Sequence, residues 1–198
     1  MHSPVPQQPS APNVRHRSGP GSGPQVPWSL PAARRAELEG VLTAELLTAV
    51  AGARRRALRD GDRQIDTAHL LHSLVEADPE AGAALGGPPQ HARVLGYLVQ
   101  RSIGYGLRWQ RSVEDTGSAL PAVRGAETAS SGWSPAAAAA LAGACERAAL
   151  RGDRRVRGLD LLAVLAADPG SRAAEVLRAA GVDRAALTVR IEELSQQV

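Results

Sequence analysis

Apolar residues recur along this chain every three or four positions, the spacing that places them on one face of an α-helix. Leu46, Val50, Ala53 and Ala57 form one such series, and residues 94–103 carry another. No stretch of the sequence alternates apolar and polar residues as a half-buried strand would. The pattern therefore predicts an all-α protein of about eight helices.

Capping residues and helix breakers predict where these helices begin and end. Thr43, Ser134 and Asp183 stand where a side-chain oxygen would cap a helix, and Gly61 stands where a helix would end. Ordered structure is expected to begin near Ser29, a further capping residue. The expected helices cover residues 44–60, 68–77, 79–85, 94–103, 135–151, 159–167, 169–180 and 184–193.

The second half of the chain repeats the first. The letters GDR at residues 61–63 return at residues 152–154, an offset of 91, and a leucine-rich helix follows each copy. The Asp-Pro break at 78–79 returns at 168–169 after the loss of one residue. This shared order indicates two tandem copies of a helical unit. Because two copies are too few for a free-standing solenoid, we expect a closed pseudo-twofold bundle.

Composition divides the chain into a tail and one domain. Residues 1–27 are rich in Pro, Ser and Gly and have almost no large apolar side chain, so we expect this tail to be disordered. Residues 28–198 form the domain. Within it we place repeat one at about 36–108, a mobile loop at about 114–132 and repeat two at about 133–197.

The cationic side chains are all arginine, because the sequence contains no lysine. A P-loop needs a lysine to reach the phosphates of a nucleotide, so an ATPase of that type is excluded. The net charge is only +3, and the arginines are interspersed with acids. We therefore favour a solvated arginine-rich surface over nucleic acid as a partner. The arginine-rich segment 54–63 keeps a DNA- or RNA-binding transcriptional regulator as the alternative.

A single cysteine, Cys145, rules out an internal disulfide. Its place in an alanine-rich helix predicts a small core residue, with a reactive thiol as the less favoured alternative. The longest apolar run, 136–145, is too short to cross a membrane, and the N-terminus has no signal-peptide pattern. We expect a cytoplasmic protein without a membrane partner.

Patterns for catalysis and metal binding are weak. His69, His72 and Glu76 share one helical face that could offer metal ligands, but no cysteine or further histidine is placed to complete a set of four. No serine lies in a G-x-S-x-G motif. We expect a protein that is not an enzyme and that uses neither a metal nor another cofactor.

Each half reads as a cap, an amphipathic helix, a glycine turn, a short β-like link and a leucine-rich helix. In this order the chain resembles the N-terminal domain of Clp-type unfoldases such as ClpC and ClpA, over residues 36–197. The ATPase modules of that family are missing here, so the resemblance implies a stand-alone version. The residues that carry it are Leu42, Thr43, Ala57, Gly61, Ile65, Thr67, Ala68, His69, Leu70 and Leu71 in the first half, and Trp133, Ser134, Pro135, Ala148, Gly152, Val156, Leu161, Leu162, Gly181, Val182 and Asp183 in the second.

The resemblance implies a substrate and adaptor platform that works with a Clp protease. The groove between the halves would be formed by Leu42, Thr43, Trp133 and Ser134. It would bind proteins or peptides, among them a Clp unfoldase, its clients or a cyclic peptide. A stand-alone domain could instead act as a decoy that sequesters such ligands. Leu42 and Trp133 could equally be hydrophobic staples without a ligand.

ClpC-like members also bind phosphorylated arginine, using a hydroxyl for the phosphate and a glutamate for the guanidinium. Thr43 and Ser134 match the hydroxyl positions, whereas Ala68 and Leu159 stand at the glutamate positions. Hydrogen bonds to charged groups contribute about 1.5–3 kcal/mol each, so the loss of both carboxylates predicts weak or absent phosphoarginine binding. Asp160 also replaces the family's histidine in the second half.

Overall fold

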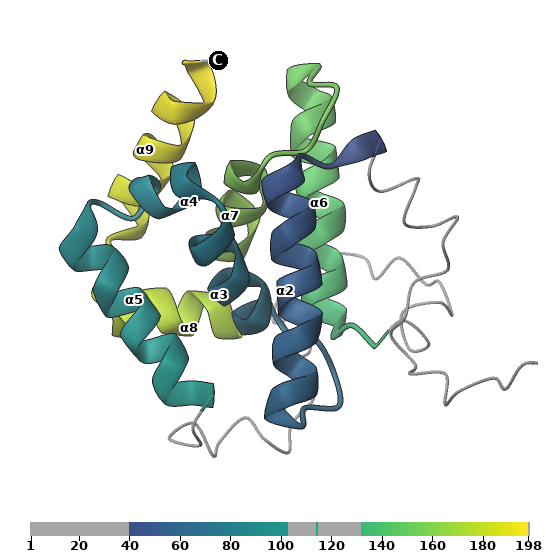
Figure 1. The fold of residues 1–198 in the computed structure, drawn as a ribbon. Helices are drawn as coiled ribbons and strands as arrows, with labels where there is room; N and C mark the ends of the chain where they lie inside the picture. Colours follow the sequence, from purple (N-terminus) through teal and green to yellow (C-terminus); the bar gives the residue numbers. More distant parts are fainter. Residues whose placement is uncertain (1–39, 103–113, 115–131, 198) are drawn as a thin grey trace, which may run out of the picture.

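The structure of the chain, a computed structural model, describes residues 40–102, Glu114 and residues 132–197. The predicted tail at 1–27, the expected start near Ser29 and most of the predicted loop lie outside the described residues. The described residues contain eight α-helices and no β-strand, which confirms the all-α prediction (Figure 1). Each of these helices is too short or too polar to span a bilayer. They are α2 (Ala44–Asp60), α3 (Thr67–Ala77), α4 (Pro79–Ala84), α5 (Pro88–Gln100), α6 (Pro135–Arg151), α7 (Gly158–Ala167), α8 (Arg172–Ala179) and α9 (Arg184–Gln196).

Local signals set most helix ends where the sequence predicts them. Thr43 caps α2 and Ser134 caps α6, and each side chain accepts a hydrogen bond from the backbone N–H three residues later. Gly61 and Gly152 end these two helices with φ of 71° and 77°, a left-handed conformation that glycine adopts without steric cost. These boundaries follow from contacts within one helical turn.

Two helix starts differ from the prediction by more than one residue. α8 begins at Arg172 rather than at Pro169, because the hydroxyl of Ser171 accepts a backbone hydrogen bond at 3.1 Å and caps the helix there. α5 begins at Pro88, before the apolar series that starts at Val94, since proline is tolerated in the first turn of a helix. In both cases the apolar spacing located the helix but not its first residue.

The core is centred on α3 and α7, which contact each other (Figure 1). α2 packs against α3, and α6 packs against α7. Around them α3 contacts α8, α7 contacts α4, α5 contacts α8, and α4 contacts α9. The leucines of the two central helices are fully buried, so their apolar surface is removed from water.

Two isolated backbone bridges join segments that are far apart in the sequence. Leu42 pairs with Val156, and Ile65 pairs with Trp133, both in the parallel direction. In each bridge, the N–H of the following helix cap donates to the carbonyl of the link residue, at 3.0 Å and 2.9 Å. Each bridge thus ties the segment before a long helix to the link before a leucine-rich helix in the other half.

Candidate functional site

The four residues predicted to form the ligand groove lie at the starts of the two long helices, α2 and α6. Leu42 and Trp133 are 4% and 7% exposed, and Ser134 is fully buried. Thr43 is partly exposed. Leu42 and Trp133 each form one of the two bridges, and Thr43 and Ser134 follow them directly. The structure therefore places all four residues against the opposite half of the chain. Of the four side chains, Thr43 has the most direct access to solvent.

The ring of Trp133 lies beneath an arginine of α2. The guanidinium carbon of Arg54 is 5.4 Å from the ring centroid, within the range of a cation–π contact. Such a contact contributes about 0.5–1 kcal/mol at an exposed site. The indole therefore connects α2 to the start of α6.

The positions that match the family's glutamates are buried in apolar surroundings. Ala68 and Leu159 are 0% and 1% exposed and lie in the first turns of α3 and α7. Neither side chain has a hydrogen-bond acceptor, and a guanidinium placed there would lose its hydration without gaining a partner. The structure thus offers a bound arginine no side-chain acceptor at these two positions.

Asp66 is the centre of a buried network of charges at the start of α3. Its carboxylate caps the helix by accepting the His69 N–H at 2.9 Å, and it pairs with Arg101 and, at 2.5 Å, with Arg172. Burial acts to raise its pKa, but the hydrogen bond and charge of His69 and the two guanidiniums hold the pKa of Asp66 well below its usual range. Asp66 is therefore an anion that links α3 to α8 and to the end of α5.

His69 contacts carboxylates through both ring nitrogens. Nδ1 lies 2.8 Å from Asp66 Oδ1 and 3.1 Å from the Asp66 backbone nitrogen, and Nε2 lies 3.1 Å from Asp62 Oδ2. A neutral ring accepts the backbone N–H at Nδ1, whereas a protonated ring donates to both carboxylates. Burial disfavours the charged ring, but the two carboxylates outweigh burial and raise the pKa of His69 above its ordinary value.

The raised pKa predicts that the contribution of His69 to stability declines in alkaline solution. A group whose pKa is higher in the folded chain stabilises it fully below the unfolded pKa, near 6.5, and loses that contribution as pH rises through the folded pKa. We expect the difference in unfolding free energy between wild type and His69→Asn to shrink as pH rises from about 6 to 9. Urea titrations at several pH values measure this difference in unfolding free energy. A difference that does not change with pH would contradict a charged His69 ring.

Three potential metal ligands meet in this network. One atom each of Asp62, Asp66 and His69 lies within 4.8 Å of the others. The guanidinium of Arg101 contacts Asp66 and lies 3.4 Å from Asp62, so a cationic side chain already supplies the positive charge that a metal ion would bring. These residues fit a buried ion-pair network better than a metal centre.

The helical face that places His69, His72 and Glu76 in one row is divided in the folded chain. His72 Nε2 lies 3.3 Å from Glu76 Oε1, whereas His69 faces Asp62 and Asp66. The metal set considered from helical spacing is therefore not assembled. Helical spacing alone does not reveal which neighbouring element each side chain meets.

Two contacts of this network have counterparts 91 residues later in which the charges are exchanged. Asp160 stands 91 residues after His69, is fully buried, and accepts the Arg157 N–H at 2.9 Å. Arg151 pairs with Asp160 at 2.5 Å, and it stands 91 residues after Asp60, which lies 3.8 Å from His69 Nε2. The replacement of the family's histidine by Asp160 is thus accompanied by a reversed partner charge.

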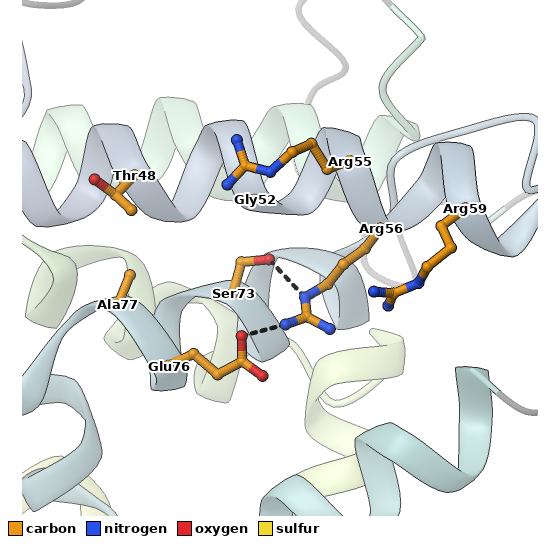
Figure 2. Close-up of a pocket in the computed structure, with 8 residues that line it drawn as sticks. All are labelled: Thr48, Gly52, Arg55, Arg56, Arg59, Ser73, Glu76 and Ala77. Atoms are coloured by element: carbon orange, nitrogen blue, oxygen red, sulfur yellow. Dashed lines mark hydrogen bonds and ion pairs between the residues drawn. The ribbon is translucent and has the colours of Figure 1, made fainter.

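A basic pocket of about 260 Å³ lies between α2 and α3 (Figure 2). Arg56 reaches from α2 to α3, where it donates to Ser73 Oγ at 3.1 Å and contacts Glu76. Arg55 and Arg59 add two more guanidiniums to the lining, and Arg59 also lies 3.4 Å from Asp60, so the pocket carries an excess of positive charge and favours an anion. The lining residues are Thr48, Gly52, Arg55, Arg56, Arg59, Ser73, Glu76 and Ala77.

Cys145 is exposed, so the expectation that it belongs to the core was wrong. Ala144 and Ala148 face the core instead, which turns the cysteine outward on α6. Partial desolvation of the sulfur and the negative charges of Asp160 and Glu146 raise the pKa of the thiol. A raised pKa lowers the fraction of the nucleophilic thiolate, so this cysteine is accessible but not activated.

One buried acid was not foreseen. Glu114 stands at the start of the predicted mobile loop, yet it is 5% exposed and bonded to Thr67, Ser134 and Arg172. The residues around it show no apolar periodicity, so the sequence contains no signal of its burial. Its partners come from three different helices, and only the fold brings them together.

Comparison of this chain with protein-family models finds no match, and comparison with curated proteins finds none either. The resemblance to the Clp N-terminal domain therefore depends on the residues and motifs of the chain itself.

Proposed function

We propose that this chain is a non-enzymatic binding module for proteins or peptides, built from two copies of one helical unit in the manner of the Clp N-terminal domain. The pair of backbone bridges carries the proposal. Adding 91 to Leu42 and Ile65 gives Trp133 and Val156, so an exchange of the halves converts the Leu42–Val156 bridge into the Ile65–Trp133 bridge. A pseudo-twofold axis between two copies produces this reciprocity.

The contacts between helices support the same arrangement. By their place in each copy, α2 corresponds to α6, α3 to α7, α4 to α8, and α5 to α9. When each helix is exchanged for its counterpart, the α3–α8 contact becomes the α7–α4 contact, and the α5–α8 contact becomes the α9–α4 contact. All four of these contacts occur. Repeated sequence and reciprocal contacts are therefore two independent reasons to propose a duplicated unit.

The ligand surface of the proposed module lies at the starts of α2 and α6. Buried Leu42 and Trp133 support this surface from below, while Thr43 and Val41, which is 45% exposed, reach solvent. Because Ala68 and Leu159 offer no carboxylate, we propose apolar and backbone contacts with a peptide rather than capture of phosphoarginine. Suitable partners are a Clp unfoldase, its clients or a cyclic peptide. The module would deliver such ligands or sequester them, and sequestration requires a concentration above the dissociation constant.

A pair of surface variants tests the position of this groove. Val41→Asp places a charge beside the groove, and Val99→Asp places one on α5 at similar exposure, 48%. On an array of random peptides, we expect wild type and Val99→Asp to bind the same apolar sequences and Val41→Asp to bind them about tenfold or more weakly. Trp133→Ala is less suitable, because truncating a buried tryptophan costs about 3–5 kcal/mol of stability. Equal binding by both variants would place the groove elsewhere.

The basic pocket between α2 and α3 favours one alternative function, a DNA- or RNA-binding transcriptional regulator. Arg55, Arg56 and Arg59 line that pocket and belong to the arginine-rich segment 54–63. The same binding assay separates the two functions when oligonucleotides are included and salt is varied. Contacts with phosphates weaken steeply as salt rises, whereas binding in an apolar groove changes little.

A further inference from the structure

The carboxylate of Glu114 lies at a point where three helices begin. Oε2 accepts the Thr67 N–H at 2.8 Å and the Ser134 hydroxyl at 3.0 Å. Oε1 accepts the Arg172 N–H at 2.7 Å and contacts the Thr67 hydroxyl. Thr67 and Arg172 are the first residues of α3 and α8, and Ser134 caps α6. Four donors therefore converge on one carboxylate, which has about four acceptor positions.

Both hydroxyl donors are oriented by a second hydrogen bond. Thr67 Oγ1 accepts the Ala173 N–H at 3.0 Å, and Ser134 Oγ accepts the Ala137 N–H at 3.1 Å. Because these bonds use oxygen lone pairs, each hydroxyl keeps its proton for Glu114. The other two donors are backbone N–H groups of helix first turns. All four donors are thus held by helical backbone rather than by flexible side chains.

The electrostatics of this junction also favour an anion. The start of an α-helix carries a partial positive charge, and here three starts face one carboxylate. Thr67 and Ser134 are 1% and 0% exposed, so little water reaches the donors. Without an anion these buried donors would be unpaired, which is costly in the interior of a protein. The junction is therefore built to hold a carboxylate or a similar oxyanion.

The donors and the carboxylate come from separate parts of the chain. Thr67 belongs to the first half and Ser134 and Arg172 to the second, whereas Glu114 stands in the sequence between them. The helices that fix the donors also pack through the leucine core, so their positions do not depend on Glu114 alone.

We propose that the starts of α3, α6 and α8 form a carboxylate receptor and that Glu114 is its intrachain ligand. When the Glu114 side chain is removed, the receptor binds a free carboxylate. In the natural chain the receptor is occupied by its own glutamate, which also engages Ser134, one of the four predicted groove residues. An external carboxylate must displace Glu114 to enter. This inference does not depend on the ligand of the proposed groove.

Acetate and the Glu114→Ala variant test the receptor directly, because acetate is the fragment that this substitution deletes. In sodium chloride we expect the variant to melt roughly 5–10 °C below wild type, since several hydrogen bonds to a charged group are lost. When acetate replaces chloride at constant ionic strength, the melting temperature of the variant should rise with the logarithm of acetate concentration. Wild type, whose receptor is filled, should show only the general effect of the salt.

Two further variants control for trivial explanations. Glu80→Ala removes an acid from an exposed pair with Arg157 at 2.6 Å, and its response to acetate should match wild type. Glu114→Gln fills the same space with an amide, so it should be destabilised but gain nothing specific from acetate. If Glu114→Ala does not fold in chloride, its refolding yield in acetate relative to chloride replaces the melting temperature. The proposal would be overturned if acetate raised the melting temperature of Glu114→Ala no more than that of wild type. It would also be overturned if Glu114→Ala and wild type were equally stable in chloride.

Discussion

Replacing Gly158 by alanine is expected to lower the free energy of unfolding by about 2–4 kcal/mol. A Cβ atom there would lie 1.9 Å from Asp78 Oδ2 and 2.9 Å from Leu74 Cδ1. The Asp78 side chain is not free to move away, because it is buried and its Oδ1 caps α4 by accepting the N–H groups of Glu80 and Ala81 at 2.9 Å and 3.2 Å. The variant must therefore displace α7 from α4 or break the cap.

Gly96→Ala is the matched control for this substitution. Gly96 lies inside α5, and no atom outside its own helix backbone is near its added Cβ. Alanine is favoured over glycine in a helix by about 1 kcal/mol, so this variant should be as stable as wild type or slightly more stable. Gly158 is the first residue of α7, where helix propensity predicts at most a smaller gain, so a loss of stability in Gly158→Ala would come from the close contact. Urea unfolding followed by circular dichroism measures both, and a Gly158→Ala midpoint equal to wild type would contradict the close contact with Asp78.

Acidification from pH 6.5 to pH 4 is expected to remove about 3 kcal/mol of unfolding free energy through His72. This histidine is 3% exposed. Burial and the charges of Arg56 and Arg59 lower its pKa to about 4, against the opposing effect of Glu76 and Asp60. Between these pH values the unfolded chain binds a proton that the folded chain does not. The unfolded state therefore gains stability as pH falls, and the effect is complete below the folded pKa.

The His72→Gln variant isolates this contribution, because glutamine does not titrate. Wild type should lose more unfolding free energy than the variant between pH 6.5 and pH 4, as measured by urea titrations at each pH. His69 acts in the opposite direction, since its pKa is raised, but it is present in both proteins and cancels in the comparison. The depressed pKa of Asp66 keeps the folded carboxylate charged in this window, and the protonation of the unfolded Asp66 near pH 4 is common to both proteins. Parallel profiles for the two proteins would contradict a buried neutral ring at position 72.

The two halves of the domain are joined by polar contacts as well as by the leucine core. Asp66 of the first half pairs with Arg172 of the second, and Glu114 binds donors from both. Breaking a buried pair by removing one partner costs about 3–5 kcal/mol, because the remaining charge is left without compensation. These contacts set how the halves meet, and so they position the starts of α2 and α6, where we propose that ligands bind.

The sequence by itself determined the all-α character of the described residues and most of their helix boundaries. The residues that begin and end α2 and α6 act through the backbone within one helical turn, so the sequence predicts their effect without knowledge of the fold. They are Thr43, Gly61, Ser134 and Gly152. The apolar spacing likewise reports which face of each helix is buried. It failed for Cys145, because in the alanine-rich α6 nearly every face is apolar and the spacing does not select one.

Only the tertiary structure decided how charged and polar groups are used. Nothing near Glu114 in the sequence indicates that three helix starts will surround it, and nothing near His69 shows that Asp62 and Arg101 will join Asp66 beside it. Likewise, only the fold shows that the carboxylate of Asp160 is paired with the guanidinium of Arg151. The physical reason is that capping and helix periodicity depend on neighbours within a few residues. A buried charge, in contrast, is stable only through partners that the packing of distant helices brings to it.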